Sequence, residues 1–235
     1  MMLDADRGVM LGPYLLGPND TEENGIYTGD ARELAKAIPD ESVDLVFTDP
    51  VYDHIDEYRW LADMANRVLV NGGNCIAQCS HEYLLPCGES MMPYLDYVWL
   101  LIEHNAGGNA RLWSKRIFAG YKPYLWFSRG LRNGHWLRDI QYGGGASKDL
   151  HIWGDTPGFF LRVIDPLLEP GMIAVDPFTG SGTVPAVCKM LDRRYLAFEI
   201  DPDVAQMARD RVRDMQPPLF VPEPEQAALW AEAAT

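Results

Sequence analysis

The hydrophobic positions of this chain follow two periods that alternate along the sequence. Short apolar runs typical of buried strands occur at 43–48, 74–79 and 172–176. Stretches with apolar residues three and four positions apart lie between them and indicate helices. Further strands are expected at 25–28, 97–103, 124–128 and 195–199. Strands that alternate with helices predict an α/β fold, with a mostly parallel sheet and helices on both faces.

Polar and small residues set the expected boundaries of the helices. Asp30 and Glu33 have the spacing of a capping box, which predicts a helix through Ala37. The glycine pair in 71–73 is expected to end the helix that follows residue 50. Later helices are expected to begin at Thr156-Pro157, with an apolar face of Phe160, Val163, Ile164 and Leu167, and at Asp201-Pro202.

The length of 235 residues, 47% of them hydrophobic, fits one α/β domain with a sizeable core. Residues 1–24 lack periodicity and are interpreted as an arm. Residues 25–215 form the expected single domain, and 216–235 form a proline-rich acidic tail. No apolar run is long enough to span a membrane, and no secretion signal is recognisable. We therefore expect a cytoplasmic protein.

The four cysteines are too few for a disulfide framework in a chain of this length. Three of them, with His81, have the spacing C-x3-C-x-H-x5-C from Cys75 to Cys87. That spacing fits no standard zinc site, so no metal is expected.

The formal net charge of −14 argues against nucleic acid, but the charge is unevenly distributed. Between His104 and Arg138 there are seven basic residues and no acidic ones, which leaves thirteen basic against thirty-four acidic residues elsewhere. Such a segment indicates an anion-binding face, although a solvated loop with chance clustering is the alternative. The candidate nucleic-acid contacts are Arg111, Lys115, Arg116, Lys122 and Arg132.

The clearest motif runs from Asp176 to Thr183, between an expected strand and an expected helix. Gly180 and Gly182 allow a ligand to approach the backbone, and the helix N-terminus offers N–H groups. Glu199 ends the next strand about 20 residues later, where an acidic side chain can accept both hydroxyls of a ribose. The pattern predicts a nucleoside-containing cofactor.

A second motif, Asp49-Pro50-Val51-Tyr52, follows the strand at 43–48. A carboxylate beside an aromatic ring at a strand end is a plausible catalytic pair. A strand-terminating turn with a buried tyrosine explains the tetrapeptide equally well.

Together the two motifs resemble those of the amino-methyltransferases that modify adenine N6 or cytosine N4 in DNA. Residues 176–183 match the family's Asp-Pro-Phe-x-Gly-Ser-Gly-Thr, and residues 49–52 match three of four positions of Asp-Pro-Pro-Tyr. The motif order is similar to that of the beta class, which implies a circularly permuted, Rossmann-like sheet. In that sheet the strand at 25–28 lies at the edge beside the one ending in Glu199. Asp30 then either meets the cofactor's adenine or simply caps its helix, or does both.

The resemblance implies S-adenosylmethionine as cofactor. The residues expected to contact it are Asp30, Asp176, Phe178, Gly180, Ser181, Gly182, Thr183 and Glu199. It also implies that Asp49 and the Pro50 carbonyl accept the amino hydrogens of an extruded base, on which Tyr52 stacks. Aspartate at position 49 favours adenine N6; cytosine N4 and an RNA target are the alternatives.

Val51 replaces the family's second proline, and it motivates a further alternative, a cofactor-binding pseudoenzyme that binds DNA without turnover. The expected recognition region is 105–153, the expected partner is duplex DNA, and a homodimer is expected by analogy only.

Overall fold

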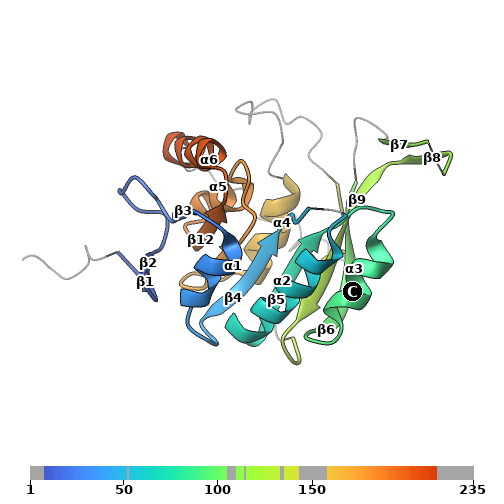
Figure 1. Ribbon diagram of the computed structural model, residues 1–235, viewed down its shortest axis with the longest axis horizontal. Coiled ribbons are helices and arrows are strands. Elements are labelled where there is room, and N and C mark those ends of the chain that lie inside the picture. The colour runs from blue at the N-terminus through green and yellow to red at the C-terminus, as the bar shows by residue number, and fades with distance from the viewer. Residues whose placement is uncertain are drawn as a thin grey trace, which may run out of the picture.

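The computed structural model describes residues 8–51, 53–104, 110–113, 115–132, 135–142 and 158–215. Its centre is an eight-stranded sheet in the order β10-β6-β9-β5-β4-β11-β12-β3, with helices on both faces (Figure 1). This arrangement confirms the Rossmann-like α/β prediction. Among the described residues, no helix is long and apolar enough to cross a membrane.

Five neighbouring strands of the sheet are parallel, which the alternation of strands and helices predicts. They are β5 (Leu69–Gln78), β4 (Val43–Thr48), β11 (Ile173–Asp176), β12 (Arg194–Glu199) and β3 (Ile26–Thr28). β3 pairs with β12 at the sheet edge, with Glu199 opposite Thr28, as the permuted order requires. On the other side of β5 lies β9 (Tyr121–Ser128), which is antiparallel to it. β6 (Asp96–His104) lies next and is antiparallel to β9, and β10 (Ile140–Tyr142) lies at the edge and is parallel to β6.

Each face of the sheet has its own hydrophobic core. Successive side chains of a strand point to opposite faces, so Val46 of β4 packs in one core while Leu45 and Phe47 pack in the other. One face is covered by α1 (Ala31–Leu34), α2 (Ile55–Val68) and α3 (Leu84–Met91), and the other by α4 (Gly158–Leu167), α5 (Thr183–Met190) and α6 (Pro202–Asp214).

One sequence expectation about these helices is wrong, and another is incomplete. α2 ends at Val68, and the glycines of 71–73 lie inside β5, where Gly72 N donates to Arg129 O at 2.7 Å. Pairing with neighbouring chain segments thus overrides the helix-stop signal. In α4, the predicted Phe160 is partly buried and stacks on Phe47, with ring centroids 5.1 Å apart. Phe159, which the prediction left out, is fully buried and stacks on Tyr124 at 4.4 Å.

Residues without a sequence pattern also form ordered structure. β1 (Met10–Leu11) and β2 (Tyr14–Leu15) make a hairpin whose Leu11 and Tyr14 are buried in the core beside α1. The Tyr14 hydroxyl donates to Leu34 O at 2.7 Å. Within the basic segment, β7 (Ala110–Leu112) pairs with β8 (Ile117–Ala119) in a second hairpin, which projects from the body (Figure 1).

Candidate active site

Four predicted acidic residues meet at one edge of the sheet. Asp49 follows β4, Asp176 ends β11 and Glu199 ends β12, and these strands are parallel neighbours. Asp30 follows β3, which is parallel to β12. Because parallel neighbours end at the same edge, residues 19 to 169 positions apart in the chain are brought together where Figure 1 shows the arrowheads.

The Asp176 carboxyl group is buried and organises the turn that follows it. Its Oδ1 accepts hydrogen bonds from Thr48 Oγ1 at 2.6 Å and from Phe178 N at 3.3 Å. Burial raises the pKa of Asp176 to about 7, and the negative charge of Asp49 adds to the rise. With 4% of its surface exposed, Asp176 is a positioning residue that joins the ends of β11 and β4.

The two glycines of residues 176–183, the glycine turn, serve different purposes. Gly182 has φ +81°, and a Cβ there would lie 3.0 Å from the Cβ of Ala208 in α6, so it allows close packing. Gly180 has φ +49°, and a Cβ there would meet nothing within 4 Å. The backbone at Gly180 therefore borders open space from which a ligand can approach.

The Glu199 carboxylate is held in one orientation beside that space. Its Oε2 accepts from Gly180 N at 2.9 Å, and its Oε1 accepts from Asp201 N at 3.0 Å. A carboxylate oxygen has two lone pairs, so each oxygen can accept a further hydrogen bond. Two acceptors side by side suit the adjacent hydroxyls of a ribose.

Asp30 and Phe178 belong to different parts of the site, Asp30 after β3 and Phe178 within the glycine turn itself. Asp30 is exposed and caps α1, with Oδ1 accepting from Arg32 N at 2.8 Å, so its capping role is confirmed. The Glu33 carboxylate instead contacts Lys36 Nζ at 2.6 Å. Phe178 is half-buried and its ring lies edge-on to Trp60 of α2, 5.6 Å between centroids.

Ser181 and Thr183 are held by a residue that the sequence analysis missed. Arg211 of α6 donates through Nη1 to Ser181 Oγ at 3.1 Å and to Thr183 Oγ1 at 3.2 Å. Its position nine residues after Pro202 carries no recognisable signal.

Asp49 lies at the same edge, directly after β4. Its side chain is exposed, whereas Pro50 is buried, and Val51 is 54% exposed. The Asp49 charge contributes to the raised pKa values of both Asp176 and Cys79, which places the carboxylate between the ends of β11 and β5. Tyr52 lies outside the described residues.

The predicted basic contacts divide into two groups. Arg111, Lys115 and Arg116 are exposed on the β7–β8 hairpin. Lys122 instead lies 3.7 Å from the Glu103 carboxylate, and Arg132 lies over the Trp126 ring at 4.5 Å and donates to His135 O. Lys122 and Arg132 therefore have partners within the body of the protein.

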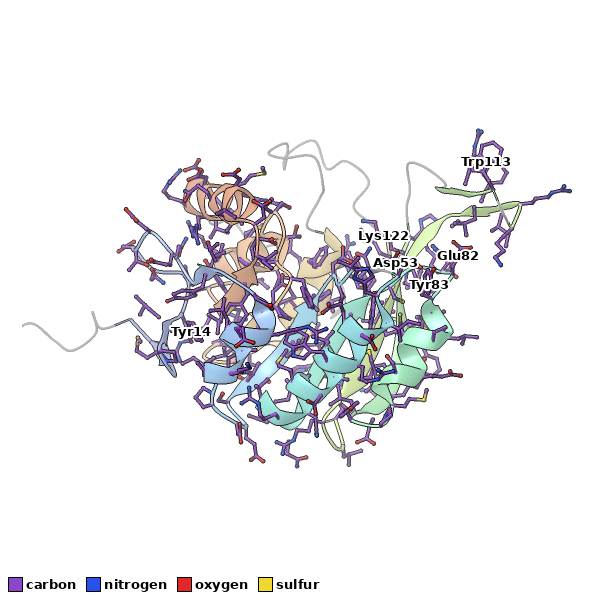
Figure 2. All side chains as sticks on the ribbon, viewed as in Figure 1. Tyr14, Asp53, Glu82, Tyr83, Trp113 and Lys122 are labelled. Atoms are coloured by element: carbon purple, nitrogen blue, oxygen red, sulfur yellow. The ribbon has the colours of Figure 1, made fainter. Side chains whose placement is uncertain are left out.

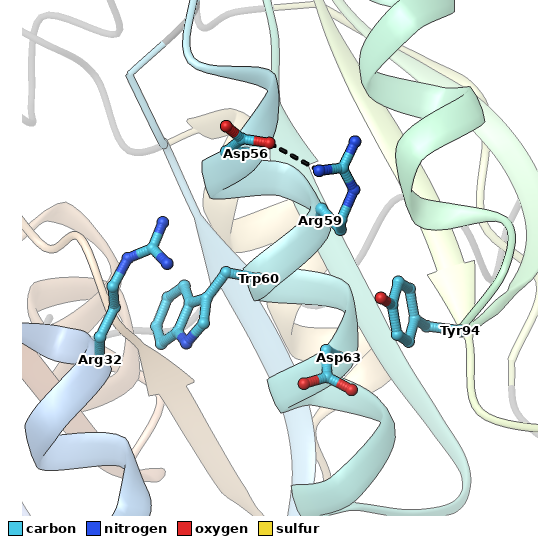
Figure 3. Close-up of a pocket in the computed structure, with 6 residues that line it drawn as sticks. All are labelled: Arg32, Asp56, Arg59, Trp60, Asp63 and Tyr94. Atoms are coloured by element: carbon cyan, nitrogen blue, oxygen red, sulfur yellow. Dashed lines mark hydrogen bonds and ion pairs between the residues drawn. The ribbon is translucent and has the colours of Figure 1, made fainter.

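An open hollow of about 430 Å³ lies along the outer face of α2 (Figure 3). Trp60 stands at its centre, with Arg32 at 5.4 Å over the ring, and Arg59 pairs with Asp56 at 2.7 Å. Its lining residues are Arg32, Asp56, Arg59, Trp60, Asp63 and Tyr94. The hollow touches the glycine turn only indirectly, because Trp60 also contacts Phe178.

Comparisons with known proteins find similarity to DNA methyltransferases. A family model described as "DNA methylase", that of the N6/N4 methyltransferases, matches residues 158–210, which contain the glycine turn. The chain is 24% identical to the type II methyltransferase M.HinfI of Haemophilus influenzae, over 83% of this chain and 69% of that one. It is also 24% identical to M.BamHI of Bacillus amyloliquefaciens, over 77% of this chain but only 55% of that protein.

Solved structures show the same fold. The M1.HpyAVI–SAM complex aligns with a TM-score of 0.66 at 20% identity, covering 80% of this chain and 98% of that one. The PvuII DNA methyltransferase, described as cytosine-N4-specific, aligns with a TM-score of 0.69 at 17% identity, covering 88% and 91%. These likenesses confirm the architecture predicted from the two motifs.

Proposed function

We propose that this chain, which belongs to the N6/N4 amino-methyltransferase family, transfers a methyl group from S-adenosylmethionine to the exocyclic amino nitrogen of a base in DNA. The observation that carries the proposal is the meeting of Asp49 with the glycine turn and Glu199 on neighbouring parallel strands. We assign the reaction to residues 25–215 and DNA contact to 105–153.

The residues at this edge fit S-adenosylmethionine. The backbone at Gly180 borders open space, and the Glu199 oxygens, each with one partner, are free to accept a ribose hydroxyl each. Asp30 and Phe178 would contact the nucleoside from the β3 side and from the turn. When bound, the cofactor supplies a methyl group on a positively charged sulfur, which is an electrophile.

Asp49 makes the amino nitrogen a better nucleophile. The lone pair of an exocyclic amine is delocalised into the base, and a hydrogen bond to a carboxylate favours the pyramidal nitrogen that can attack. Methylation leaves the nitrogen with a surplus proton, which Asp49 would accept. The Pro50 carbonyl would accept the second N–H, and Tyr52 would stack on the base.

We propose adenine N6 as the target, because position 49 holds aspartate. The support is the sequence resemblance; cytosine N4 is the alternative, because the PvuII enzyme, which has a similar fold, is described as cytosine-N4-specific. The base would be turned out of the duplex, since its amino group is otherwise paired. We place the reaction in the cytoplasm, as expected from four cysteines that are free and buried. A homodimer stays a prediction.

The test is methyl transfer from labelled S-adenosylmethionine to unmethylated DNA, with the modified nucleoside identified by mass spectrometry. We expect N6-methyladenine. Asp49→Ala should lower the rate at least about a hundredfold, because it removes the proton acceptor, while the dissociation constant of the cofactor changes by less than about threefold.

Asp63→Ala is the matched control, because Asp63 is an exposed carboxylate on α2. It should leave both the rate and cofactor binding unchanged. N4-methylcytosine as product would keep the mechanism and overturn the choice of base. An Asp49→Ala variant with full activity would overturn the catalytic assignment, and cofactor binding without any transfer by the unmodified chain would support a pseudoenzyme.

A further inference from the structure

The β7–β8 hairpin carries large apolar side chains into solvent. Trp113 is 78% exposed, Phe118 65% and Ile117 54%. A two-stranded ribbon is marginally stable by itself, and exposed apolar surface of this kind marks a place where a partner binds. Packing within the protein therefore does not account for the exposed apolar side chains of the hairpin, and a binding partner would.

One face of the hairpin is an ordered stack of two rings and a cation. Arg111 lies directly opposite Phe118 in the antiparallel register, and Trp113 is two residues further on the same face. The Arg111 guanidinium lies over both rings, 5.6 Å from the centre of Trp113 and 5.7 Å from that of Phe118. Such contacts hold the rings in place while they remain exposed.

The position of the hairpin relates it to Asp49. β6 is antiparallel to β9, and β9 is antiparallel to β5, so β6 ends at the edge where β4 and β5 also end. The hairpin lies in the connection from β6 to β9 and therefore extends from this edge. Figure 2 shows Trp113 out on the hairpin, beyond Lys122 at the start of β9.

The charge of the hairpin identifies the class of partner. Lys115 and Arg116 lie in its turn, and no acidic residue occurs in the sequence between His104 and Arg138, in a chain of net charge −14. Exposed rings beside cations suit a polyanion that presents stacked aromatic bases. The chemistry therefore favours duplex DNA, in which phosphates and stackable rings repeat along the whole polymer, over an acidic protein surface, where exposed rings are few.

We propose that the hairpin enters the duplex beside the target base and that Trp113 fills the gap in the base stack, with Arg111 and Phe118 supporting its ring. The inference rests on the proposed function, since it gives DNA as the substrate. A side chain that wedges between bases offsets part of the cost of unstacking them. Single-stranded DNA has no such cost, so it should not need Trp113.

The experiment compares methyl transfer to duplex DNA and to heat-denatured strands of the same sequence, for the full chain and for Trp113→Ala. We expect Trp113→Ala to lower kcat/KM on the duplex about ten- to a hundredfold, in line with the loss of one stacked ring. On single strands the value should change less than about twofold. Trp113→Phe should recover most of the duplex activity, because the ring is retained.

Leu85→Ala is the control, because Leu85 is 75% exposed on α3, outside the hairpin. Equal losses on duplex and single strands, or no loss on either, would overturn the wedge. A change in self-association in place of a change in duplex activity would show that a second copy of the chain covers the hairpin. If the unmodified chain methylates neither substrate, the proposed function itself fails, and the wedge fails with it.

Discussion

The glycine turn and the β7–β8 hairpin lie at the same edge of the sheet but are held in opposite ways. The turn is fixed by three elements of the body, through Thr48 of β4, Glu199 of β12 and Arg211 of α6. The recorded ring contacts of Trp113 and Phe118 are instead with Arg111 of the same hairpin. The site that must position atoms is thus held by the body of the protein, whereas the exposed rings are held by contacts within their own hairpin.

The largest expected effect is on the free energy of unfolding and comes from the buried Asp176 of the glycine turn. The pKa of Asp176 is raised from 3.8 to about 7 in the folded protein, so folding favours the protonated form. This contribution to stability is fully present below about pH 4 and is lost as the pH rises through 7. It amounts to a few kcal/mol over that interval, at about 1.4 kcal/mol per pH unit.

Asp176→Asn keeps the shape and cannot ionise, so its free energy of unfolding should depend less on pH between 4 and 7. Urea unfolding at several pH values measures the difference. If the free energy of unfolding changed with pH equally in the two proteins, Asp176 would have an ordinary pKa. The Asp176 carboxyl group would then be less buried than the structure indicates.

The next effect tests whether the rigid turn is a ligand site. Glu199→Ala should raise the dissociation constant of S-adenosylmethionine about thirtyfold, because about 2 kcal/mol of hydrogen bonding to a charged group is lost. Calorimetric titration measures it. Glu89→Ala, an exposed carboxylate on α3, serves as the control. If Glu199→Ala bound S-adenosylmethionine with unchanged affinity, Glu199 at the end of β12 would not contact the nucleoside.

The smallest effect belongs to the hairpin. Replacing Lys115 and Arg116 with glutamate should weaken DNA binding about tenfold at low salt. The logarithm of the binding constant should also fall less steeply with the logarithm of the salt concentration, by about two units of slope. Fluorescence anisotropy across a salt series measures both. The same replacement of Lys36 and Arg59, two exposed residues of the body, should have little effect. An equal loss there would mean that DNA binding follows the total charge instead of the hairpin.

How far the sequence predicted this molecule depends on the range of the interactions. The strands at 43–48 and 195–199 and the capped helix from Asp201 follow from local patterns, and the structure confirms them. The continuation of β5 through Gly72 depends on pairing with residues near Arg129, about sixty positions away, which no local pattern encodes.

The same distinction applies to the candidate site. Asp49, Gly180 and Glu199 were found because their residue types and spacing carry chemistry, and the structure places them at one edge. Arg211 was missed because an arginine late in a charged helix looks like a solvated residue until α6 is seen beside the turn. The pairing of Arg111 with Phe118 on the hairpin was missed as well, because these two residues become neighbours only through cross-strand pairing.

The pairing of β3 with β12 has a consequence for how the protein is made. Ile26 lies opposite Ala197, 171 residues later, so β3 leaves the ribosome long before its partner exists. Until β12 emerges, the early strand has unsatisfied edge groups that invite wrong pairing. Its short length of three residues and the hairpin of β1 and β2 beside it limit that hazard during synthesis. Folding of the edge should therefore be among the last events, and slow, as contacts of such long sequence separation generally are.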